Sequence, residues 1–245
     1  MEKNFEFELE SISSITIKTA WPQIEINTDA GNSIRLMITG DDGSVATLVV
    51  EEKDGNLNIE QPYFGINKSY LQGSWMQILL ILPESYSKPL SVNSVSGSCI
   101  ATGYHGEQLK FDFISGDIQL RDIATKKLRI KEVSGDITAD TINADSVKIR
   151  GVSGKALFKA LSTNTLASNY VSGAVSLYIT NEFESMDFVS VSGNINIYQP
   201  YTALDVSVRS VSSSLVLQNV EQKDSAAKIG INAVTARITI GRNNN

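Results

Sequence analysis

The segment Ile114-Ser115-Gly116-Asp117-Ile118 returns as Val133-Ser134-Gly135-Asp136-Ile137, 19 residues further along the chain. Its core, an aliphatic residue followed by Ser-Gly, recurs every 19 or 20 residues, with copies that begin at Val95, Ile114, Val133, Val152, Val171 and Val191. Two altered copies follow, Val211-Ser212-Ser213 and Val234-Thr235-Ala236. A fixed period near 20 residues is typical of a solenoid, in which equivalent residues of successive coils stack.

Alignment on the Gly gives apolar columns at positions −7, −5, −2, +2, +4 and +7, and all are expected to face inward. Gaps of two residues indicate strands, and no window has the spacing of an amphipathic helix. The repeat predicts an all-β fold, a single-stranded right-handed parallel β-helix with coils of about 19 residues. Eight coils should stack in chain order from about Leu90 to Gly241. The last coil, at Arg237–Gly241, should present an uncapped edge.

The chain divides into residues 1–89, an irregular β-rich N-terminal cap, and residues 90–245, one continuous solenoid domain. Turn signals in the cap predict a hairpin between Thr47–Glu52 and Leu57–Gln61. Extra residues in the longest final repeat should bulge near Glu221–Ser225.

Composition limits the function classes. The 245 residues carry a net charge of −6, which argues against binding to nucleic acid, and the single Cys99 excludes an intrachain disulfide. No stretch reaches the roughly 18–20 apolar residues of a transmembrane helix, and Met1–Glu8 does not resemble a signal peptide. These features favour the cytoplasm, unless an anchor was removed from the chain.

The apolar strand Met76–Pro83, the segment that begins at Leu90 and the repeated Ser-Gly-Asp-Ile together resemble the bacterial DUF4097 family over roughly residues 10–241. The resemblance implies a parallel β-helix with an adhesin-like role, no known enzyme activity and an association with the cell envelope or surface. It brings no accepted catalytic or ligand-binding residues.

Few residues suggest catalysis. His105 is the only histidine, and Cys99 falls in an interior column. No zinc spacing or phosphate-binding glycine loop occurs, so neither a metal nor a cofactor is expected. Asp117 and Asp136 share one column and could serve a carbohydrate-active β-helix enzyme together with nearby Lys and Arg. A turn preference for small polar residues explains the same column.

Basic residues form the clearest candidate binding surface. Lys110, Arg129 and Lys148 share one outward column, and Lys131 and Arg150 follow Asp112 in the next. Like charges in register repel, with Asp112 and Glu132 expected to offset part of the cost. The pattern indicates a patch for an anionic glycan, an envelope polymer or lipid headgroups. A solvated face is the alternative interpretation.

Aromatic residues offer a second candidate surface, formed by Tyr63, Phe64, Tyr70 and Trp75. Their rings could stack on sugars or grip a partner, or they could pack as a lid over the first coil. The leading hypothesis is a non-enzymatic binding or scaffold protein with an anionic polymer or a protein as partner. The alternatives are the carbohydrate-active enzyme and an intracellular regulatory interaction module.

Overall fold

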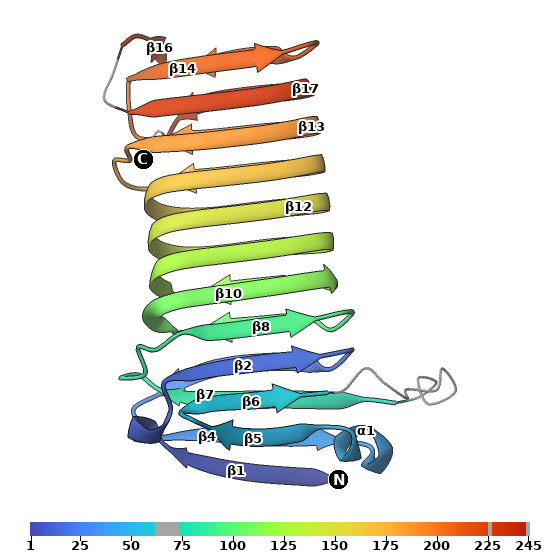
Figure 1. The fold of residues 1–245 in the computed structure, drawn as a ribbon. Coiled ribbons are helices and arrows are strands. Elements are labelled where there is room, and N and C mark those ends of the chain that lie inside the picture. Colours follow the sequence, from blue (N-terminus) through green and yellow to red (C-terminus); the bar gives the residue numbers. More distant parts are fainter. Residues whose placement is uncertain (62–73, 225–226, 244–245) are drawn as a thin grey trace.

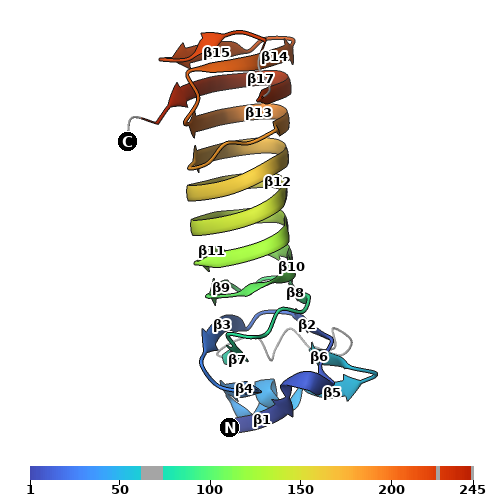
Figure 2. The same ribbon diagram turned by 90° about the vertical axis from the view of Figure 1, so that its left-hand side faces the viewer.

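The computed structural model describes residues 1–61, 74–224 and 227–243. It is an all-β column whose strands stack along one axis (Figures 1 and 2). The helical content of the described residues is the 3-10 turn Leu9–Ser11 and the short helix α1 (Asp42–Ala46). No helix in these ranges is long and apolar enough to span a membrane.

The central coils pair in parallel at the period of the repeat. They comprise β8 (Leu90–Ser94), β9 (Cys99–Thr102), β10 (His105–Ser115), β11 (Ile118–Arg121), β12 (Ile123–Ile179) and β13 (Ser185–Gln199). Leu109 pairs with Leu128 and Ile118 with Ile137, 19 residues on, whereas Leu166 pairs with Met186, 20 residues on. Equivalent residues therefore lie in ladders with the strand spacing of about 4.8 Å.

The Ser-Gly phrase forms a corner of each coil. Gly135 and Gly154 have φ angles of 152° and 115°, a region that L side chains avoid. A Cβ atom added to Gly154 would lie 2.0 Å from the Gly135 carbonyl oxygen. The Ser153 hydroxyl donates to the Val133 carbonyl of the preceding coil at 3.1 Å. The phrase therefore allows two backbones to approach closely at each turn.

One predicted interior column is wrong. The aliphatic residue of the phrase, at position −2, is exposed rather than buried in Ile114, Val133, Val152, Val171, Val191, Val211 and Val234. Position −3 faces inward instead, as Phe113 and Tyr170 illustrate. The strand keeps its two-residue alternation through −7, −5 and −3 before it turns, so −2 points outward.

The N-terminal strands continue the column. β2 (Ser14–Thr19) and β3 (Gln23–Asp29) pair in parallel with β8 and β9 on one side and with β6 (Asn56–Glu60) and β7 (Met76–Pro83) on the other. Antiparallel pairing follows, from β5 (Val49–Lys53) to β6, from β4 (Ser33–Gly40) to β7, and from β1 (Glu2–Glu8) to β4. The β5–β6 pair confirms the predicted hairpin. The end of the column thus changes from parallel to antiparallel pairing.

The C-terminal coils do not stack in chain order, contrary to the prediction. β17 (Lys228–Arg242) pairs with β13 on one side and with β14 (Ala203–Ser210) and β15 (Ser214–Gln218) on the other. The final coil is therefore inserted beneath the one before it, as Figure 1 shows at the top of the column. Arg237–Gly241 is accordingly an internal segment, and the outermost coil is formed by β14 and β15.

The inserted coil differs from the outermost coil in its interior side chains. The inward residues of β17 include Ile229, Ile231, Ile238 and Ile240, all fully buried, whereas the corresponding positions of β14 and β15 carry Val and Leu. Placing the isoleucine coil in the middle buries its apolar surface on both sides. The long final repeat supplies the connecting chain, part of which forms the short strand β16 (Glu221–Gln222) beside β14.

Candidate binding groove

The five basic residues singled out in the sequence line one hollow. Lys110 pairs with Arg129, and Asp112 pairs with Lys131, across β10 and β12. The hollow has a volume of about 250 Å³ and is lined by Lys110, Asp112, Arg129, Ile130, Lys131, Lys148 and Arg150. The stacking of three coils thus gathers side chains that are 40 residues apart in sequence. We call this surface the basic groove.

Only one cation of the basic groove has an acidic partner among the described residues. The Lys110 ammonium lies 2.5 Å from the Asp112 carboxylate. Within the described ranges, no ion pair involves the side chains of Arg129, Lys131, Lys148 or Arg150. Stacked like charges at strand spacing repel by up to about 1 kcal/mol per neighbouring pair in water. The groove is therefore a concentration of uncompensated positive charge on an acidic protein.

On the opposite face of the same coils, side chains of opposite charge stack next to one another. There Asp140 lies between two cations, 2.7 Å from the Lys159 ammonium and 4.0 Å from the Arg121 guanidinium. This ladder alternates in sign, as expected where charge serves only to keep a sheet face hydrated. The same-sign columns of the basic groove depart from that arrangement.

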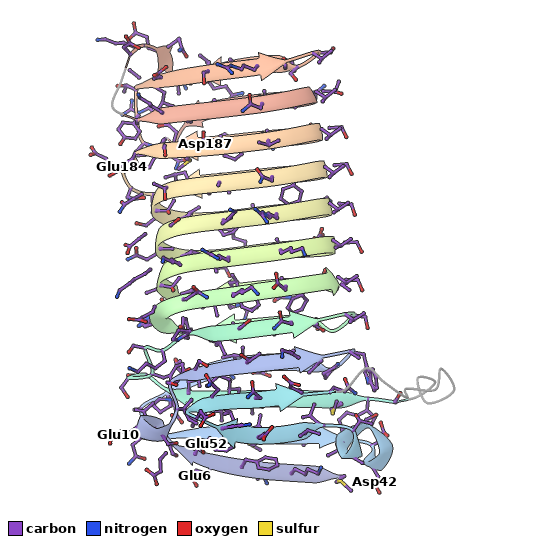
Figure 3. The ribbon with its side chains drawn as sticks, in the orientation of Figure 1. Glu6, Glu10, Asp42, Glu52, Glu184 and Asp187 are labelled. Carbon is purple, nitrogen blue, oxygen red and sulfur yellow. The ribbon has the colours of Figure 1, made fainter. Side chains whose placement is uncertain are left out.

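A second hollow extends the groove along the column. It has a volume of about 310 Å³, shares Arg129 and Lys148 with the first, and reaches Asp187 on β13. Figure 3 labels Asp187 near the C-terminal end of this face. An extended anion could follow the basic side chains over several coils, and Asp187 would limit it at one end.

Glu132 does not offset the basic charges, contrary to the sequence-based expectation. It occupies the inward position −3 and is only 1% exposed, and neither carboxylate oxygen has a hydrogen-bond partner in the described structure. Burial, reinforced by the nearby charges of Asp136 and Asp117, raises the pKa of Glu132 to about 7. The hydroxyl of Tyr170, also buried, lacks a partner as well. Two-residue alternation was the sequence signal that could have placed Glu132 inside.

The stacked carboxylates of Asp117 and Asp136 accept hydrogen bonds from the backbone of the next coil. The Asp136 amide donates to the Asp117 carboxylate at 3.0 Å, and the Lys155 amide donates to the Asp136 carboxylate at 2.9 Å. Each side chain thus ties its coil to the next. Within the described ranges, no group of three or more His, Cys, Asp or Glu residues could hold a metal ion.

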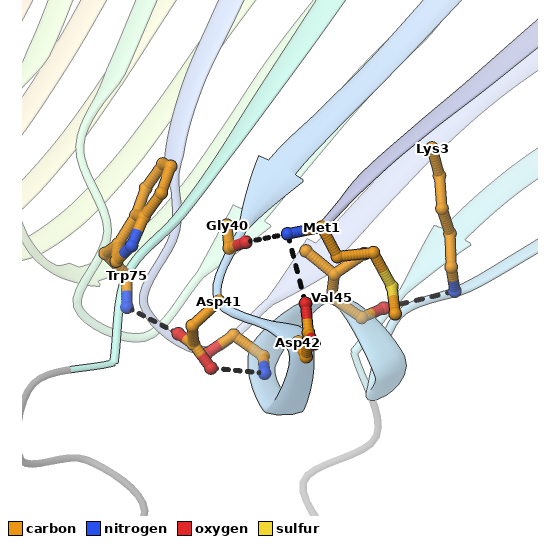
Figure 4. Close-up of polar contacts among 8 residues, drawn as sticks. Met1, Lys3, Gly40, Asp41, Asp42, Val45 and Trp75 are labelled. Atoms are coloured by element: carbon orange, nitrogen blue, oxygen red, sulfur yellow. Dashed lines mark hydrogen bonds and ion pairs between the residues drawn. The ribbon is translucent and has the colours of Figure 1, made fainter.

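The aromatic candidates are only partly described. Tyr63, Phe64 and Tyr70 lie outside the described residues. Trp75 is 56% exposed, and its backbone amide donates to the Asp41 carboxylate at 2.9 Å (Figure 4). Hydrogen bonds from Ser44 and Trp75 hold the pKa of Asp41 at about 2. Trp75 is therefore anchored through its backbone at the start of α1, and more than half of the residue is exposed.

The remaining reactive residues do not form a catalytic set in the described structure. Cys99 is fully buried, and burial raises the pKa of its thiol. His105 is exposed in a shallow hollow that also contains Lys126 and Asp145. The Cys99 thiol therefore lies in the interior and the His105 imidazole on the surface, so the two do not form a catalytic pair.

Comparisons with known proteins identify the fold. A Bacteroides fragilis structure described as a "putative adhesin" aligns with a TM-score of 0.62 and 15% identity over 98% of this chain and 97% of that chain. A Parabacteroides distasonis "putative lipid binding protein" aligns with a TM-score of 0.65 and 18% identity, covering 96% of each chain. A P. distasonis "putative adhesin" gives a TM-score of 0.60 at 12% identity over 97% of each chain.

None of these three descriptions names an enzyme, and at such identities the likeness concerns the fold. A search of the curated proteins found no match. The sequence profile of the Toastrack DUF4097 family matches residues 12–244, which is nearly the whole chain. The repeat, the parallel ladder and this match agree, and the chain belongs to the Toastrack DUF4097 family.

Proposed function

We propose that this protein is a non-enzymatic binding protein whose basic groove holds an anionic polymer, such as an acidic glycan or a phosphate-rich envelope polymer. Lys110, Arg129, Lys131, Lys148 and Arg150 are the residues that bind it. Two columns of cations at strand spacing match a ligand with closely spaced negative charges. Lipid headgroups presented by a membrane offer similar charges and are the second ligand class to test.

One observation carries the proposal. Four cations of the groove have no acidic partner in the described structure, although the protein has more acidic than basic residues. Acidic side chains could have been placed among them at little cost, as Asp140 is on the opposite face. Uncompensated like charge is stabilised when an anion binds, and it favours capture of that anion from solution.

The carbohydrate-active enzyme is less well supported. A glycosidase needs two carboxyl groups that flank the bond to be cleaved. Asp117 and Asp136 instead accept hydrogen bonds from backbone amides, and neither lines the basic groove. The solved relatives described above as putative adhesins and a putative lipid binding protein support a binding role instead. An intracellular regulatory role remains the third hypothesis.

We also expect a handedness, a capping role and a location for this protein. The coils wind right-handed, because crossovers between parallel strands strongly prefer that hand. Residues 1–89 act as a cap on the solenoid of residues 90–245, with β5, β4 and β1 closing the edge. A groove for an envelope polymer places the protein at the cell envelope or surface, where the adhesin-named relatives are expected to work.

Retention on immobilised heparin, an anionic glycan, tests the groove. We expect the wild-type protein to elute only with added salt, and the double charge reversal R129E/K148E to flow through, because it removes two central cations and adds two repelling charges. Vesicles that contain phosphatidylglycerol provide the membrane arm. Retention on heparin without vesicle binding favours a free polymer, and stronger vesicle binding favours headgroups.

The matched control is K53E/K223E, which changes the net charge equally at two exposed lysines outside the groove. It should keep the wild-type elution position. Circular dichroism checks that each variant is folded. Equal losses in both variants would indicate a nonspecific charge effect, and unchanged elution of R129E/K148E would rule out the groove.

A further inference from the structure

Among the residues that the structure describes, the outermost C-terminal coil has a neighbouring coil on one side only, whereas β17 has one on each side. Leu215 on β15 occupies an interior column but is 42% exposed, whereas its neighbour Ile238 on β17 is fully buried. Val211, at the outward position −2 of the same coil, is 84% exposed, whereas Ile114, Val133 and the other exposed residues of that column are 36–54% exposed. Figure 2 shows β14 and β15 at the end of the column. An exposed apolar coil with a free strand edge is a strong template for pairing.

The free edge of β14 is well defined. The Asp205 amide donates a hydrogen bond to the carbonyl of Ala227, just before β17. Because backbone groups alternate in direction along a strand, those of Asp205, Ser207 and Arg209 all point toward β17. Residues in alternation with them direct their backbone groups outward, and within the described ranges β16 pairs with the first part of this outer edge, at Ala203 and Leu204, and with no later residue of it. The backbones of Val206 and Val208 therefore face the open end.

We propose that a second copy of this chain covers this end, with the two β14 strands antiparallel across a two-fold axis at Ser207. In this register the pairing runs from Asp205 to Arg209 and stops before Leu204, whose carbonyl already accepts a hydrogen bond from the Lys223 amide. Val206 lies opposite Val208 of the second copy, and the two residues can exchange backbone hydrogen bonds. The Gln222 side chain already donates to the Val206 carbonyl at 3.0 Å, and a carbonyl oxygen can accept a second hydrogen bond. The inference is independent of the basic groove.

Charge complementarity selects a second copy as the occupant. The same register places Asp205 of one chain opposite Arg209 of the other, and the two-fold axis produces this pair twice. Neither side chain has an ion-pair partner within the described part of its own chain. The outward residues Asp205, Ser207 and Arg209 are acidic, small and basic in that order. The segment is therefore complementary in charge to an antiparallel copy of itself.

The opposite face follows the same symmetry. Val216 is the midpoint of β15, and an antiparallel β15 pair centred there places Leu215 against Leu217 of the second copy. The apolar interior would then continue through the junction.

Sedimentation velocity with charge-reversal variants tests the proposal. We expect the wild type to dimerise with rising concentration, and D205R or R209D each to weaken the dimer by about tenfold or more, because like charges then face each other. The double variant D205R/R209D restores opposite charges and should recover the dimer. R150D, in the basic groove, should dimerise as the wild type does, which separates this test from that of the groove.

Disulfide trapping tests the register without altering charge. Ser207 meets its own copy at the axis as a pair without hydrogen bonds, with Cα atoms about 4.5 Å apart, within the range of a disulfide. S207C should form a covalent dimer on mild oxidation. S91C, in the same outward column on β8, should not. A wild type that stays monomeric at every concentration, or a dimer that tolerates both single reversals, would overturn the proposal.

Discussion

At the scale of single residues, Glu132 is the most unusual feature of the interior. Its carboxylate lies in a corner with Tyr170, while the charges of Asp117 and Asp136 are close enough to raise its pKa further. Gly151 lies between Glu132 and Tyr170 in the same column, and a Cβ there would come within 2.1 Å of the Tyr170 ring. The corner therefore depends on a glycine, a buried acid and an aromatic ring together.

This corner predicts a pH-dependent stability. The pKa of Glu132 rises from 4.5 in the unfolded chain to about 7 in the folded protein, so the folded state binds more protons between these values. The contribution of Glu132 to the free energy of unfolding is greatest below about pH 4.5, falls as the pH rises, and reaches its minimum above about pH 7. The loss is at most about 3 kcal/mol.

Urea unfolding at pH 5 and pH 8 measures the effect of Glu132. We expect E132Q to be more stable than the wild type at pH 8 by about 1–3 kcal/mol and nearly equal to it at pH 5, since the amide carries no charge at either pH. The control variant E182Q, at an exposed residue, should show the same difference in free energy of unfolding between pH 5 and pH 8 as the wild type. If E132Q also showed the wild-type difference in free energy of unfolding between the two pH values, Glu132 could not be the source of the pH dependence.

At the scale of the strand and its corner, the glycines of the repeat determine how closely coils stack. Gly154 combines a positive φ with an approach to the Gly135 carbonyl that leaves no room for a side chain. Gly230 on β17 is different, because a Cβ there would be tight only against the Asp187 carboxylate, the end of a flexible side chain, with the Ser207 hydroxyl at an ordinary 3.8 Å. The two positions therefore separate the corner effect from the general effect of adding a methyl group.

Stability measurements on G154A and G230A test this distinction. We expect G154A to lower the free energy of unfolding by at least about 2 kcal/mol, because it adds backbone strain and a steric clash. G230A should change it by less than about 1 kcal/mol. Both values come from urea denaturation, and equal effects of the two substitutions would show that the corner tolerates a side chain.

The sequence predicts the elements well, because the repeat constrains every coil in the same way. The period and the columns at −7, −5, +2 and +4 follow directly from residues such as Leu109 and Ile118. The column at −2 was misplaced, because Val133 and Val152 are aliphatic and hydrophobicity alone cannot show on which side of the turn a strand bends. Backbone alternation, which places Phe113 and Glu132 inside, was the more reliable signal.

At the scale of the whole molecule, the order of the coils could not be predicted. A period assigns residues to columns but does not say which coil lies next to which, so the insertion of β17 between β13 and β14 depends on side-chain packing and loop length. The basic groove could be predicted, because its residues lie in consecutive coils of the central stack. The candidate pairing site at Ser207 emerged only once the structure showed which coil is outermost.

Disulfide trapping along one outward column tests the stacking of the coils most directly. Asp187 lies next to Ala167 on one side and next to Gly230 on the other, with Cα atoms about 4.8 Å apart, whereas Ser207 is two strand spacings away. Cys99 is buried and should not compete. We predict that A167C/D187C and D187C/G230C form intrachain disulfides and that D187C/S207C does not. Failure of the first pair would contradict the ladder, and ready closure of the third would contradict the inserted coil.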